Sequence, residues 1–98
     1  MMRDNLIVAA ILAMTFIGTD AKSQAMIEMT MITCKQYLSQ PADRQDIIAS
    51  WMSGYFNAAR GNAVLDTARF ERNKRAVTAY CRKNGAAGLM SAIQRNAR

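Results

Sequence analysis

The chain has 98 residues and a formal net charge of +6 at pH 7, and 51% of its residues are apolar. This length accommodates one small domain and excludes several. The chain has no histidine, which excludes the commonest metal ligand and the side chain that ordinarily titrates between pH 5 and 8.

Residues 1–25 have the features of a cleavable secretion signal. A twelve-residue apolar run at 6–17 precedes small residues suited to cleavage after Ala25 or, alternatively, after Ala21. The run is too short to span a membrane, which takes roughly 20 helical residues. We therefore expect residues 26–98 to form one exported domain without stable membrane insertion. A short membrane anchor and a buried helix are the alternatives.

Two cysteines, Cys34 and Cys81, follow this segment. In a small exported domain such a pair usually forms a structural disulfide, and closing so long a loop stabilises the fold by about 4 kcal/mol. Two free thiols or an intermolecular bridge are the alternatives. Two thiols alone cannot complete a zinc shell, and the pair lacks the Cys-x-x-Cys spacing of redox enzymes, so we expect no metal and no cofactor.

The composition favours helices, since the chain has a single proline and no convincing alternation of apolar and polar residues after the leader. A first short helix is predicted at 33–38, with Thr33 as N-cap and with Tyr37 and Leu38 pointing inward. Pro41 ends it, because the residue before a proline avoids the helical conformation.

A second helix is predicted from Asp43, as the cap, to Arg60, with Asp46 in its first turn and Gly61 just past its end. Its apolar residues cover about half of the circumference, which is wider than an ordinary surface helix needs. They are Ile47, Ile48, Trp51, Met52, Tyr55, Phe56, Ala58 and Ala59.

A connector follows at 62–66, and we expect its Val64 and Leu65 to pack against the core. A third helix, capped by Asp66 or Thr67, is predicted to end at Lys83. Its inner face carries four residues, Phe70, Val77, Tyr80 and Cys81, and its outer face carries Arg72, Arg75, Arg82 and Lys83.

Asn84 and Gly85 stop this helix. A last helix is predicted to begin near Ala86, with an apolar stripe of Leu89, Met90 and Ile93. The sequence therefore predicts a small all-α domain, a bundle of four to five short helices tied by one disulfide between the first and third.

Three segments resemble one family, the HdeA/HdeB family of periplasmic acid-stress chaperones. They are TCKQYL at 33–38, WMSGY at 51–55 and VTAYCRKN at 77–84. The order of the segments, the cysteine separation and the apolar last helix agree over 31–94, although Gly85 stands where the family often has proline.

The resemblance implies a periplasmic, disulfide-linked helical protein that forms a dimer, here a homodimer, near neutral pH. It also implies dissociation and loosening in acid, capture of acid-denatured proteins on exposed apolar surface, and no cofactor. On this chain the apolar residues expected to contact clients or the second subunit are Ile48, Trp51, Met52, Tyr55 and Phe56. About half of them should be core, and Met52 and Phe56 are expected nearer the surface than Trp51.

Without histidine, acid sensing must depend on carboxylates, whose reference pKa values lie near 4. The carboxylates after the leader are Glu28, Asp43, Asp46, Asp66 and Glu71. Residues 26–98 contain 11 Lys and Arg against 5 Asp and Glu, a net of +6 that protonation of all five would raise to about +11.

The alternative, from a different class of function, is that the chain is a small exported binding module without chaperone activity. Such a module would be of the inhibitor or immunity type, or it would bind anionic surfaces. Six basic residues could serve an anionic surface: Arg69, Arg72, Lys74, Arg75, Arg82 and Lys83. A solvated helix face is the ordinary explanation of such residues, and export argues against nucleic acid as a partner. The chain has no paired carboxylates in an evident pocket and no phosphate-binding loop, so we expect no enzyme and assign no catalytic residue.

Overall fold

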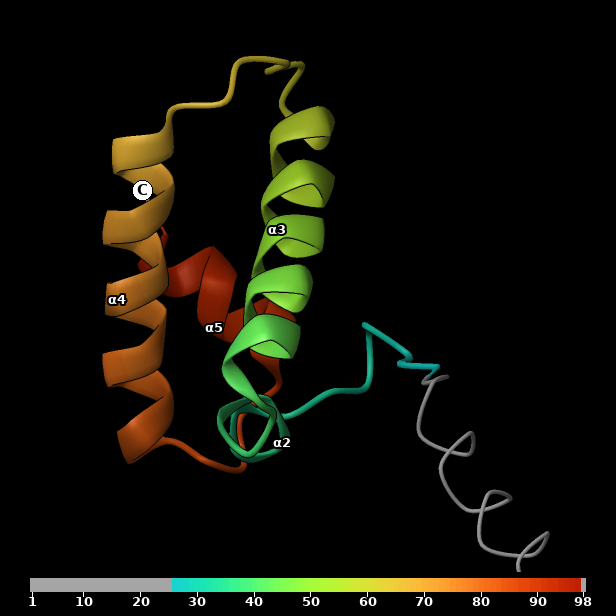
Figure 1. The fold of residues 1–98 in the computed structure, drawn as a ribbon, viewed down its shortest axis with the longest axis vertical. Helices are drawn as coiled ribbons and strands as arrows, with labels where there is room; N and C mark the ends of the chain where they lie inside the picture. Colours follow the sequence, from blue (N-terminus) through green and yellow to red (C-terminus); the bar gives the residue numbers. More distant parts are fainter. Residues whose placement is uncertain (1–25, 98) are drawn as a thin grey trace, which may run out of the picture.

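The computed structural model describes residues 26–97, and four helices make up most of this range (Figure 1). They are α2 (Cys34–Leu38), α3 (Ala42–Ala59), α4 (Thr67–Lys83) and α5 (Leu89–Asn96). α3 and α4 run antiparallel and are joined at one end by a connector, α2 lies at the opposite end, and α5 crosses behind the pair. The predicted all-α bundle is confirmed.

The short helix α2 begins as predicted at Thr33, where a capping box forms. The Thr33 hydroxyl accepts from the Gln36 backbone N–H at 3.1 Å, and the Gln36 side chain accepts from the Thr33 N–H at 2.9 Å. These two bonds satisfy N–H groups that have no partner within the helix.

The next two N–H groups of α2 bond to a distant segment. Cys34 N–H donates to the Ala87 carbonyl at 2.8 Å, and Lys35 N–H donates to the Gly85 carbonyl at 2.9 Å. Residues 85–88 are held outside a helix by these bonds, so α5 begins at Leu89. The predicted start near Ala86 is therefore wrong.

At α3 the predicted cap is wrong and the predicted end is confirmed. Pro41 is the N-cap residue, and Asp43 lies in the first turn, where its Oδ1 accepts from the Arg44 N–H at 2.9 Å. Proline fixes φ near −60° at this position, and the helix can start directly after it. Gly61 follows the helix with φ 71°, a conformation that glycine adopts without a steric penalty.

Helix α4 is capped by Asp66, whose Oδ1 accepts from the Arg69 N–H at 3.0 Å, and it ends at Lys83, with Asn84 as its C-cap residue. In the connector, Val64 is 73% exposed and Leu65 is 69% exposed. The prediction that both pack against the core is wrong, because the ends of α3 and α4 that they join lie away from α2, at the far end of the bundle (Figure 1).

The core lies where α2, α4 and α5 meet the inner side of α3. The Cys34–Cys81 disulfide lies inside it, with Cys34 0% and Cys81 1% exposed, and links α2 to α4 across 47 positions of sequence. The predicted disulfide is confirmed. The other buried residues are Ile32, Tyr37, Ile48, Met52, Val77, Leu89 and Ala92, and half-buried Phe70 and Tyr80 lie on the inner side of α4.

Candidate functional site

Helix α3 carries an exposed apolar row on its outer side, which we call the α3 stripe and define as Ile47, Trp51 and Tyr55. These side chains are 64%, 44% and 51% exposed, respectively. Their spacing of four places them one above the other along the helix. The rings of Trp51 and Tyr55 stack with centroids 5.2 Å apart and planes 12° apart, so these two residues present one continuous aromatic surface.

The remaining predicted surface residues of α3 turn inward. Ile48 and Met52 are 0% exposed, and half-buried Phe56 packs against the core. Met52 is thus more buried than Trp51, which reverses the predicted order. Ile47, outside the predicted set, is exposed instead, because the inner side of α3 runs through Ile48, Met52 and Phe56.

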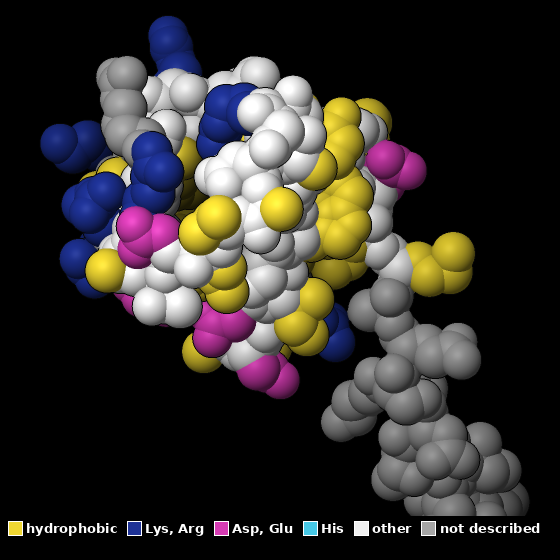
Figure 2. All heavy atoms as spheres, turned by 90° about the horizontal axis from the view of Figure 1, so that it is seen from above, with side chains coloured by type: hydrophobic (Ala, Val, Ile, Leu, Met, Phe, Trp, Pro, Cys, Tyr) yellow, Lys and Arg dark blue, Asp and Glu magenta, His cyan; other side chains and the backbone are white. Residues whose placement is uncertain are grey.

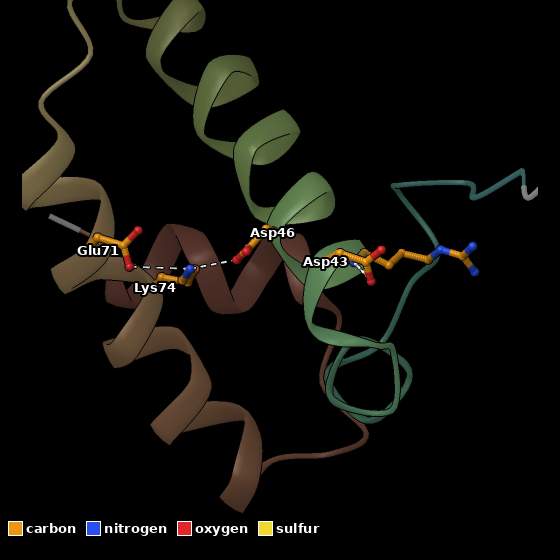
Figure 3. A network of polar contacts seen from close by, with 5 residues as sticks. Asp43, Asp46, Glu71 and Lys74 are labelled. Carbon is orange, nitrogen blue, oxygen red and sulfur yellow. Dashed lines mark hydrogen bonds and ion pairs between the residues drawn. The ribbon is translucent and has the colours of Figure 1, made fainter.

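Figure 3 shows an ion-pair network that joins α3 to α4 through Lys74. The Lys74 Nζ lies 2.7 Å from Oδ1 of Asp46 and 3.4 Å from Oε1 of Glu71. The Asp46 and Glu71 side chains are 60% and 53% exposed, and pairs so open to solvent contribute at most about 1 kcal/mol each.

The structure does not bring the other three predicted pH-sensing carboxylates, Glu28, Asp43 and Asp66, into this network. Glu28 accepts a hydrogen bond from the Thr30 hydroxyl at 2.8 Å in the segment before α2. Asp43 and Asp66 serve the N-terminal turns of α3 and α4. Only Asp46 and Glu71 share a partner. Lys74 is the member of this network that the sequence did not indicate, because its contact with Asp46 spans 28 positions.

Two pKa values depart from their ordinary range near this network. The hydrogen bond with Asp46 raises the pKa of Lys74, against a smaller opposing effect of burial, and the bond with Glu71 adds to the increase. This contribution to stability is therefore complete at neutral pH and is lost as the pH rises through the raised value. Burial raises the pKa of the Tyr37 phenol. The charge of Lys74 lowers this pKa and the charge of Asp46 raises it, both by smaller amounts.

A cleft of about 280 Å³ opens between the connector, the last turns of α3 and α5, and the first turns of α4. It is lined by apolar and polar groups, and its one carboxylate, Asp66, caps α4. Across residues 26–97, no cluster of three or more His, Cys, Asp or Glu side chains is placed to hold a metal ion.

None of the helices in the described range is both long and apolar enough to span a bilayer. No curated protein and no solved structure matches the chain significantly. The family model of the HdeA/HdeB family matches residues 5–91. This range contains both cysteines, the α3 stripe and the Lys74 network, and it is most of the chain. The chain therefore belongs to the HdeA/HdeB family, whose members are periplasmic acid-stress chaperones and not enzymes.

Proposed function

We propose that this chain is a periplasmic chaperone that binds acid-denatured proteins when low pH loosens its helices. The α3 stripe is the observation that carries the proposal. It is the one place in the described helices where two aromatic rings and an aliphatic side chain are exposed side by side. Contiguous exposed apolar surface of this kind is typical of protein-binding sites.

Loosening would enlarge this surface, because the buried Ile48 and Met52 and the half-buried Phe56 lie on the same helix as the stripe. The folded stripe then makes the first contact with a client, and the inner side of α3 extends it after the helices separate. The residues expected from the sequence to bind clients thus take part at two different stages.

Acid acts in two ways on this fold. Protonation of Asp46 and Glu71 removes the charges that bind Lys74 and weakens the link between α3 and α4. Protonation of all five carboxylates also raises the net charge of residues 26–98 from +6 to about +11, which increases self-repulsion. The network supplies no more than about 1 kcal/mol per pair, so the gain in repulsion is the larger part of the proposed switch.

At neutral pH the α3 stripe is also the surface on which a second copy of the chain is best able to pack. We propose that a homodimer forms through it and that dissociation in acid uncovers it. The secretion signal expected at residues 1–25 lies outside the described residues, and we retain export to the periplasm as part of the proposal.

A triple variant tests the stripe directly: Ile47→Ser, Trp51→Ser and Tyr55→Ser. At pH 3 we expect half-maximal suppression of client light scattering to need about tenfold more of the triple variant than of the wild type. The reason is that large aromatic side chains dominate apolar contacts.

The matched control is Met31→Ser, Val64→Ser and Leu65→Ser, which removes three apolar side chains that are 69–73% exposed elsewhere. Circular dichroism at pH 7 verifies that both variants fold. Equal activity of the two triple variants would show that the stripe has no special role.

A further inference from the structure

The solvent-facing side of α4 carries four exposed cations, which we call the α4 basic face: Arg72, Arg75, Arg82 and Lys83. Their spacing places them within one arc of the helix, along about 17 Å of its length. The other exposed residues in this arc are alanines, Ala68, Ala76 and Ala79, which leave room for close approach.

No acidic side chain of residues 26–97 pairs with this face, since both ion pairs in that range belong to Lys74. Glu71 lies at the edge of the face, one turn before Arg75, but its carboxylate bonds to Lys74 on the side of α3. The remaining carboxylates lie on α3, at the start of α4 or before α2. The fold thus pairs none of these acids with the α4 basic face.

Figure 2 shows Lys and Arg side chains gathered on the α4 side of the molecule, whereas a broad apolar area lies on the α3 side. The α4 basic face and the α3 stripe therefore point in different directions. A molecule bound to a surface through α4 leaves the α3 stripe open to the surrounding solution.

We propose that the α4 basic face binds the anionic phospholipid surface of a membrane bounding the periplasm, as a peripheral contact without insertion. A helix face that carries four cations with small residues between them suits a flat layer of phosphate headgroups. Each Lys or Arg near such a surface adds to the attraction, which salt weakens. The inference does not depend on chaperone activity, and the two can fail separately.

The test is co-sedimentation with vesicles of equal parts phosphatidylglycerol and phosphatidylcholine, or of phosphatidylcholine alone. The protein is expressed as the full chain and recovered as the exporting cell processes it. We expect the wild type to bind to the anionic vesicles only. A variant with glutamine at all four positions of the α4 basic face should bind them roughly tenfold or more weakly. About 0.5 M salt should also weaken the binding of the wild type.

A matched control removes the same net charge from other elements: Lys35→Gln, Arg44→Gln, Arg60→Gln and Arg95→Gln. It should keep most of the binding to anionic vesicles. Each variant lowers the net charge by four, so the two variants should protect a client in acid equally well. Equal weakening by the two variants, equal binding to the two vesicles, or insensitivity to salt would overturn the proposal. Tighter binding to duplex DNA than to the anionic vesicles would overturn the choice of lipid.

Discussion

Replacing both cysteines, Cys34→Ser with Cys81→Ser, should lower the free energy of unfolding at pH 7 by about 4 kcal/mol. The bridge closes a loop across 47 positions, and in the chain-entropy model the loss of such a constraint has this magnitude. A domain of this size has only a few kcal/mol more than that in total. Denaturant titration followed by circular dichroism measures the change.

The same variant should lose client protection at low pH. When acid separates the helices, the disulfide still holds α2 to α4, so the loosened chain stays compact and returns to its fold on neutralisation. Without the bridge nothing covalent limits its expansion. Full protection of an acid-labile client by the double variant at pH 3 is the result that would rule out this role, and wild-type protein treated with a reductant provides a second comparison.

Met52→Ala should produce the second large effect, because it empties part of the core on the inner side of α3. Met52 is 0% exposed, and truncating a buried methionine to alanine costs about 2–5 kcal/mol. Less acid is then needed to separate the helices. We therefore expect lower stability at pH 7 and the onset of client protection at a higher pH than in the wild type.

Met31→Ala is the matched control, since it makes the same chemical change at a side chain that is 73% exposed. Its stability and its onset pH should equal those of the wild type. If Met52→Ala lowers stability but leaves the onset pH unchanged, loosening of the core does not limit activation. Light scattering of a client across a series of pH values, measured beside the denaturant titration, separates these cases.

Local signals predicted much of the fold because their physical causes are local. Thr33 begins α2 because its hydroxyl reaches the third backbone N–H, and Gly61 ends α3 because that position has a positive φ. The disulfide followed from two cysteines in a small domain expected to be exported. None of these features needs knowledge of which helix packs on which.

The predictions that failed depend on tertiary contacts. Residues 85–88 are kept from continuing into α5 by bonds to α2, which no local pattern announces. On α3 the apolar arc covers half of the helix, so periodicity alone could not decide whether Met52 or Trp51 faces inward. The pairing of Lys74 with Asp46 arises only when α3 and α4 lie together.

The central claim is that acid turns this small disulfide-linked bundle into a chaperone. The most direct measurement mixes the purified, oxidised protein with an acid-labile periplasmic protein and follows light scattering from pH 7 to pH 2. The account predicts no suppression of scattering at pH 7 and strong suppression once the carboxylates are protonated. Scattering that is never suppressed at any acidic pH would contradict the account, and suppression that is equal at pH 7 would contradict its dependence on acid.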